Sequence, residues 1–198
     1  MILFKYSKTD GAEFISHLDM IRHIGRTLKR ANIEVKQSEG FNKHSRVFLS
    51  APIGVGIKSF CEYCTVDTDC NAELFLKKFN DFSPKGIKCL KAVETLKNPN
   101  IAGIITSADY EIKGLNKFNE NEILDKKSII IEDKRGKNKE IRDKIIKIVW
   151  KNDIFYATLK FGNENLRADL FAEMLKDLYG GDILEIIKSE AYSNEPLL

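Results

Sequence analysis

"FISHLDMIRHIGRTLKRA", residues 14–31, combines a helix start signal with a regular stripe of apolar residues. Ser16 with Asp19 three residues later predicts a capped helix start. Beyond it, apolar side chains recur every three to four residues, as in a helix that packs on a sheet; they are Leu18, Ile21, Ile24, Leu28 and Ala31. The stretch predicts an amphipathic helix from Ser16 to about Ala31.

This helix also separates its polar side chains. At about 100° per residue, the cations gather on the face opposite the apolar stripe; they are Arg22, Arg26, Lys29 and Arg30. His17, in contrast, falls on the inward side in the first turn. An inward histidine at a helix start is expected near the end of a sheet, where loops converge.

The segments around this helix follow the order β-α-β-β-α-β, which predicts a ferredoxin-like half over residues 1–97. Besides the helix at 16–31, the expected elements are a helix capped by Asn71 over 71–82 and strands over 2–7, 33–38, 46–50 (continuing after a glycine-rich bend as 60–67) and 87–96.

The C-terminal part repeats the pattern more loosely after a linker over 98–107. Within 108–198, a hairpin is expected to turn at Asn152–Asp153, and a helix from 166 is expected to end at Gly180 and Gly181. The predicted fold class is therefore α+β, with tandem ferredoxin-like (βαββαβ) halves, antiparallel sheets and helices on one face.

A second unusual stretch is "SEGFNKHSRVFLSAPIGVG", residues 38–56, which gathers Gly40, Phe41, Asn42, His44 and Arg46 in one loop. Gly40 permits a positive φ, so the loop can turn sharply and bring Phe41 down as an anchor. Arg46 has the geometry to bind phosphate oxygens in pairs. The loop is a candidate binding site.

We hypothesise that the imidazoles of His17 and His44 meet at the end of one sheet. Four further polar side chains would surround them: Asp19, Asn42, Arg46 and Glu62. Such a group suits acid–base chemistry or phosphate binding. Two alternatives stay open: the same groups satisfy the loop backbone and lock the helix onto the sheet, or the two histidines and a carboxylate hold a metal.

The cysteines favour neither a zinc site nor disulfides. Cys61 and Cys64 form a C-x-x-C, but the surrounding residues alternate like a strand, and positions three apart in a strand face opposite ways. No second pair completes a zinc site. We expect no metal and no other cofactor.

From the sequence we expect neither a membrane-spanning helix nor a secretory signal peptide. The chain of 198 residues has a formal net charge of +3. It has no apolar run near the roughly 20 residues of a spanning helix. "MILFKYSKTD", residues 1–10, lacks the apolar core of a signal peptide. A cytoplasmic protein with no membrane partner is expected.

The two quoted stretches resemble the radical SAM-linked protein family, a bacterial domain of unknown function often fused behind, or encoded near, a radical SAM enzyme. The matching residues are Phe14, Ser16, His17, Leu18, Asp19, Arg22, Ser38, Gly40, Phe41, Asn42, His44, Arg46, Pro52, Gly54, Gly56, Glu62 and Tyr63. Lys43 and Ser45 stand where the family has prolines. The three-cysteine C-x-x-x-C-x-x-C motif of a radical SAM enzyme is missing, so the resemblance implies a partner or detached module of such an enzyme, in a separate chain.

Three functions follow as expectations. The first is a non-catalytic RNA-binding or substrate-presenting module for a radical SAM enzyme that modifies tRNA or rRNA, in which basic patches at 22–30 and 134–144 contact phosphates. The second is an endoribonuclease using His17 and His44, with Asp19 as a further catalytic candidate. The third is a protein–protein adaptor for the radical SAM enzyme.

Overall fold

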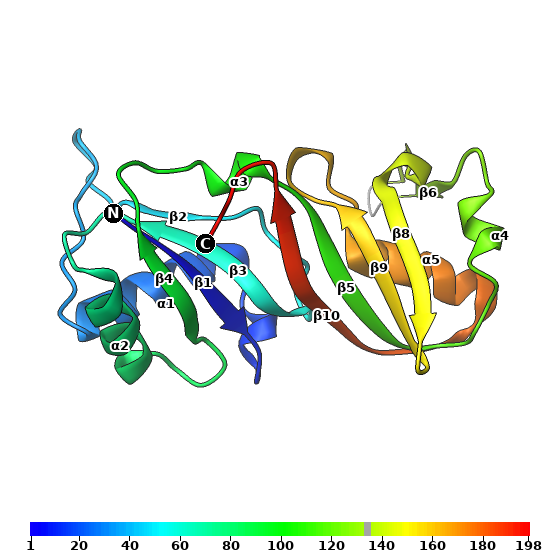
Figure 1. The fold of residues 1–198 in the computed structure, drawn as a ribbon, viewed down its shortest axis with the longest axis horizontal. Coiled ribbons are helices and arrows are strands. Elements are labelled where there is room, and N and C mark those ends of the chain that lie inside the picture. The colour runs from blue at the N-terminus through cyan, green and yellow to red at the C-terminus, as the bar shows by residue number, and fades with distance from the viewer. Residues whose placement is uncertain (133–135) are drawn as a thin grey trace. The chain divides into compact units, whose positions relative to one another are not determined.

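The computed structural model describes residues 1–132 and 136–198, which form two compact units (Figure 1). Unit 1 comprises Met1–Ile105 together with Ser193–Leu198, and unit 2 comprises Thr106–Tyr192.

Unit 1 follows the expected chain order and builds one antiparallel arrangement, β4–β1–β3–β2. Its elements are β1 (Ile2–Lys8), a 3-10 turn η1 (Ala12–Phe14), α1 (His17–Arg30), β2 (Val47–Leu49), β3 (Lys58–Val66), α2 (Ala72–Phe82), β4 (Cys89–Glu94) and α3 (Ile101–Ile104). In the central strand β1, Phe4 lies opposite Ala92 of β4 and Cys64 of β3.

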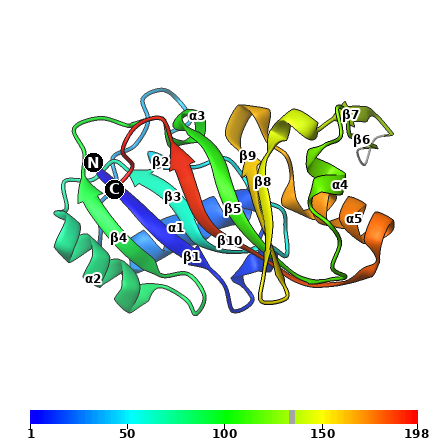
Figure 2. The ribbon, with the colours of Figure 1, turned by 45° about the vertical axis from the view of Figure 1, so that its right-hand side comes forward.

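The core of unit 1 lies between its sheet and the two helices α1 and α2, which cover the same face (Figure 2). The ring of Phe4 lies 5.1 Å from the rings of both Phe75 and Phe79, and all three are fully buried. Burial of each such ring contributes about 1.5–3 kcal/mol. The predicted α+β class with antiparallel sheets is confirmed.

The start of α1 confirms its predicted cap and corrects its predicted stripe. The Ser16 hydroxyl accepts a hydrogen bond from the Asp19 N–H at 3.2 Å. Leu18 was expected in the core but is 67% exposed, and Met20 is buried instead. The reason is angular: Leu18 lies about 120° around the helix from the buried Ile24, beyond the edge of the face that meets the sheet.

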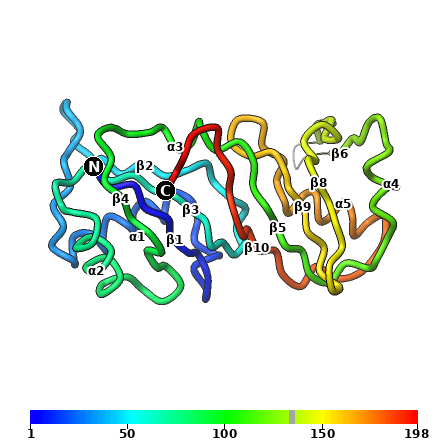
Figure 3. The backbone as a smooth tube through the Cα atoms, in the orientation of Figure 1, coloured from blue at the N-terminus to red at the C-terminus, as the bar shows by residue number. Residues whose placement is uncertain are grey.

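Two expected segments differ in the structure. Residues 33–38 form no strand; they make an isolated bridge between Gln37 and Ser45, and Figure 3 traces them as part of a long connection from α1 to β2. The edge position beside the end of β3 is already taken by β2, so no ladder remains for them. In the expected linker 98–107, Ile101 and Ile105 are buried and lie in α3 and the start of β5 (Ile105–Leu115).

Unit 2 has the strand order β10–β5–β9–β8, with a separate two-stranded ribbon of β6 and β7. Its further elements are α4 (Asn121–Leu124), β6 (Ile130–Glu132), β7 (Asn138–Glu140), η2 (Arg142–Lys144), β8 (Ile145–Lys151), β9 (Ile154–Lys160), η3 (Gly162–Glu164), α5 (Ala168–Tyr179) and β10 (Gly181–Ser193). The ribbon has no counterpart in unit 1.

The local signals of unit 2 are confirmed. Asn152 and Asp153 have φ of 46° and 63°, the left-handed pair that a tight hairpin between β8 and β9 needs. Gly180 ends α5 with φ 81°. Phe155 and Phe171 are fully buried in its core, and the partly buried Phe118 packs on Phe155 and stacks on Tyr179 with ring centroids 4.1 Å apart.

Candidate functional site

The structure does not bring His17 and His44 together. His17 begins α1, where Lys8 and Glu62 act on it electrostatically, near the start of β3. The loop of His44 leads to Arg46, whose guanidinium lies 3.0 Å from the carboxylate of Asp67, just past the end of β3. At about 3.3 Å per residue, Glu62 and Asp67 are about 16 Å apart along the chain. The prediction that the two imidazoles meet is therefore wrong. The first turn of α1, with His17, lies over the start of β3, whereas the connection from α1 to β2, with His44, runs past the end of β3.

His17 belongs instead to a polar group that we call the α1-start cluster: Lys8, Glu13, His17, Ser59 and Glu62. The register explains it, because Lys8 pairs with Ser59 and Tyr6 pairs with Glu62, which places these side chains on the helix-covered face of the sheet. The Ser59 hydroxyl donates to Glu62 Oε1 at 2.8 Å. Ser59, Glu62, Lys8 and Glu13 are all at most 6% exposed.

The electrostatics of the α1-start cluster follow from this burial. Desolvation lowers the pKa of Lys8, and Glu62 and Glu13 oppose that change. Desolvation also lowers the pKa of His17, opposed by Glu62 and reinforced by Lys8. The imidazole is therefore neutral at pH 7 and offers both a hydrogen-bond donor and an acceptor.

Three members of the cluster were missed by the sequence analysis: Lys8, Glu13 and Ser59. A signal for Lys8 was present, since period-two alternation along β1 places Lys8 on the same face as Phe4 and Tyr6. Ser59 had no such signal, because a bulge shifts the register between Tyr6 and Lys8 and decides its partner.

The 38–46 loop is exposed and held by its own hydrogen bonds. Gly40 has φ 105°, as expected, but the ring of Phe41 is fully exposed and anchors nothing, because the loop lies away from the core. Ser38 and His44 close the loop: Ser38 N–H donates to His44 O at 2.8 Å, and the Ser38 hydroxyl lies 2.9 Å from His44 Nδ1. Asn42 is exposed. Asp19 accepts from Ser16 and Arg22 at 2.8 Å each, and so does not orient an imidazole.

The basic face of α1 is the clearest surface feature of unit 1. Its four cations are exposed: Arg22, Arg26, Lys29 and Arg30. Arg30 is partly engaged, since Nη2 donates to Phe82 O at 3.0 Å. With these four cations and the single carboxylate of Asp19, α1 carries a net charge of +3, equal to that of the whole chain. The rest of the chain is therefore neutral in sum, and the excess positive charge is local.

The second expected basic patch is less clear. Lys134 and Arg135 lie outside the described residues. Arg142 uses its guanidinium to hold the Leu124 carbonyl, with Nη2 donating at 2.6 Å. Glu140 lies among these cations, and hydrogen bonds from Ser128 and the N–H groups of Ile129 and Arg142 lower its pKa to about 2.

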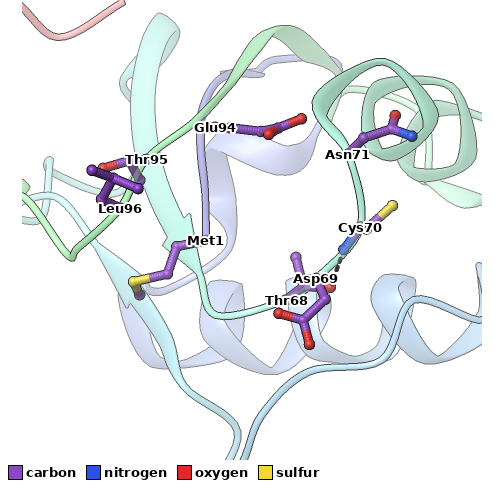
Figure 4. Close-up of a pocket in the computed structure, with 8 residues that line it drawn as sticks. All are labelled: Met1, Thr68, Asp69, Cys70, Asn71, Glu94, Thr95 and Leu96. Carbon is purple, nitrogen blue, oxygen red and sulfur yellow. Dashed lines mark hydrogen bonds between the residues drawn. The ribbon is translucent and has the colours of Figure 1, made fainter.

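A hollow of about 350 Å³ lies beside the N-terminus of α2 (Figure 4). Its polar groups already have partners: Asn71 caps α2, Glu94 accepts from Ala72 N–H at 3.3 Å, and Asp69 lies 2.7 Å from the Lys36 ammonium. The Thr68 hydroxyl accepts from Cys70 N–H at 3.2 Å. The hollow offers a ligand few unengaged groups.

Among residues 1–132 and 136–198, no group of three or more His, Cys, Asp or Glu side chains is arranged to hold a metal ion. Cys64 lies in the helix-covered core and Cys61 does not. In the same described ranges, no helix combines the length and the hydropathy of a membrane span.

The chain belongs to a bacterial family described as "Uncharacterized protein conserved in bacteria (DUF2344)", which matches residues 1–168. No curated protein matches the sequence.

Two solved structures match the chain, and one of them is similar in fold. A chain from the crystal structure of a Cbf5-Nop10-Gar1 complex has a TM-score of 0.51 and 8% identity, over 98% of this chain and 50% of that one. This chain therefore spans about half the length of that neighbour, and the likeness shows the fold alone. An unknown protein from Galdieria sulphuraria has 11% identity over 98% of both chains, but its TM-score of 0.28 supports no inference.

Proposed function

We propose that this chain is a non-catalytic RNA-binding or substrate-presenting module that works with a radical SAM enzyme, and that the basic face of α1 holds the RNA backbone. The observation that carries the proposal is the concentration of the chain's excess positive charge on this one exposed face. Such charge attracts phosphates regardless of sequence.

Two further points support it. The strand order β4–β1–β3–β2 with helices on one face fits the ferredoxin-like interpretation of unit 1, an architecture built around a four-stranded sheet as in RNA-recognition modules. The resemblance of the His17 and His44 stretches to the radical SAM-linked family supports the choice of partner. The alternative of two-histidine RNA cleavage lacks geometric support, because the imidazoles lie at different ends of β3.

The test is binding of labelled tRNA and rRNA fragments across a salt series. The variant R22Q/R26Q/K29Q removes three cations from the face, and Arg30 is left because it holds Phe82 O. K77Q/K91Q/K97Q is the matched control, with the same loss of charge at exposed positions elsewhere in unit 1. We expect the slope of log affinity against log salt to shrink by about 2 for the first variant, at about 0.7 per lost phosphate contact, and to stay unchanged for the control.

Two results would contradict the proposal: no RNA binding at low salt, or an equal loss in both variants. The partnership has a separate test, which is co-purification with a co-expressed radical SAM enzyme before and after nuclease treatment. Association that survives nuclease without any RNA binding would favour a protein adaptor instead.

A further inference from the structure

Three large apolar side chains stand exposed where η1 and the 54–57 turn meet the start of α1. Phe14 is 68% exposed, Leu18 is 67% exposed and Val55 is 60% exposed. The two backbone segments are tied together, since Gly56 N–H donates to Glu13 O at 2.9 Å. A cluster of exposed apolar side chains on a protein surface indicates an interaction site.

The backbone that carries the ring of Phe14 is anchored by its neighbours. The preceding residue, Glu13, is only 6% exposed, and its carboxylate accepts from Gly11 N–H at 2.7 Å. On the other side, the Cε1 atom of Phe14 lies 3.8 Å from where a Cβ on Gly56 would stand, and Gly56 has φ +90°. The ring therefore lies beside a turn residue that has no side chain, while most of its area faces solvent.

The basic face begins directly after this ring. Leu18 stands four residues before Arg22, which is followed four residues on by Arg26 and three residues after that by Lys29. His17, the first residue of α1, adds a neutral imidazole at the same end. An aromatic ring at the end of a row of cations is complementary to a polyanion whose bases are unstacked and free to present their flat faces.

We infer that Phe14 is a stacking platform for an unpaired base, so that the ligand of the α1 basic face is single-stranded RNA. This inference rests on the proposed function and names its substrate class. A duplex keeps its bases inside, and its higher charge density favours it in binding by charge alone. Stacking on Phe14 reverses that order of preference.

The experiment compares a fluorescein-labelled ten-nucleotide RNA with the same strand annealed to its complement. The wild type is expected to bind the single strand more tightly. Stacking adds affinity without releasing counterions, so Phe14→Ala should weaken single-strand binding about 5- to 150-fold and leave the salt slope unchanged.

Two variants separate stacking from apolar contact. Phe14→Tyr keeps the ring and should bind as the wild type, whereas Phe14→Leu keeps the bulk without the ring and should bind weakly. Leu96→Ala, which removes a fully exposed apolar side chain just after β4, is the control and should leave binding intact. A 2-aminopurine in the strand should lose fluorescence on the wild type and on Phe14→Tyr only.

The outcomes distinguish this inference from the proposal beneath it. Salt-dependent binding that favours the duplex, or that Phe14→Ala and Phe14→Leu leave unchanged, overturns the stacking platform and keeps the basic face. Absence of salt-dependent binding to any RNA overturns both.

Discussion

The two ends of β3 carry the most distinctive residues of the chain in opposite environments. At the start of β3, His17 and Glu62 lie with Lys8 and Ser59 in a mostly buried polar cluster under the first turn of α1. At the end of β3, Phe41, Asn42 and His44 are exposed in a loop that Ser38 closes by local hydrogen bonds.

This difference in burial predicts which of these residues contribute to the free energy of folding. A buried polar group destabilises the fold unless another group satisfies it, whereas an exposed one is satisfied by water. Substitutions in the α1-start cluster that leave a buried group without its partner should therefore destabilise the fold most, and substitutions in the 38–46 loop should change stability little.

Glu62→Ala should cause the largest loss, about 2–4 kcal/mol of unfolding free energy, because it leaves the Ser59 hydroxyl and the Lys8 ammonium buried without this carboxylate. Glu39→Ala, in the exposed loop, is the matched control and should stay within about 0.5 kcal/mol. Urea unfolding of both variants measures the difference. Equal losses would remove the contrast between the two ends.

Arg46→Gln should cost less than Glu62→Ala, about 1 kcal/mol, because 44% of the Arg46 side chain is accessible and the Lys36 ammonium remains 3.9 Å from the buried Asp67 carboxylate. Lys43→Gln, which is exposed in the same loop, should have no measurable effect. The loss for Arg46→Gln should shrink further in high salt. A loss as large as that of Glu62→Ala would mean that this end of β3 is as important to stability as the other.

His17→Gln should have the smallest effect, visible as a change in pH dependence. Burial lowers the pKa of His17 below its ordinary value of 6.5, so the unfolded chain binds a proton at a higher pH than the folded chain does. Stability is therefore full above about pH 6.5 and falls as the pH decreases toward the lower folded pKa.

Thermal unfolding between pH 5 and pH 8 measures this. His17→Gln should flatten that part of the profile. A profile unchanged by His17→Gln would show that this imidazole does not contribute to the acid-side loss.

Much of the local structure could be predicted. The Ser16 and Asn71 caps and the turn at Asn152–Asp153 depend on residues close in the chain, and each is confirmed. The basic face of α1 follows from the same periodicity. The prediction for residues 33–38 failed because it depends on a distant partner, since β2 already occupies the ladder beside β3. The prediction for Leu18 failed for a local reason, its angle on the helix.

The caps, turns and amphipathic faces follow from the amino-acid sequence, because neighbours a few positions apart settle them through hydrogen bonds and side-chain spacing. The association of His17 with Lys8 and Glu62, and of His44 with Ser38, depends on long-range packing. These associations depend on the register of β1 against β3, bulge included, and on which end of β3 the first turn of α1 covers. Both are set by packing between segments about fifty residues apart, and a single amino-acid sequence carries no direct signal for such long-range packing.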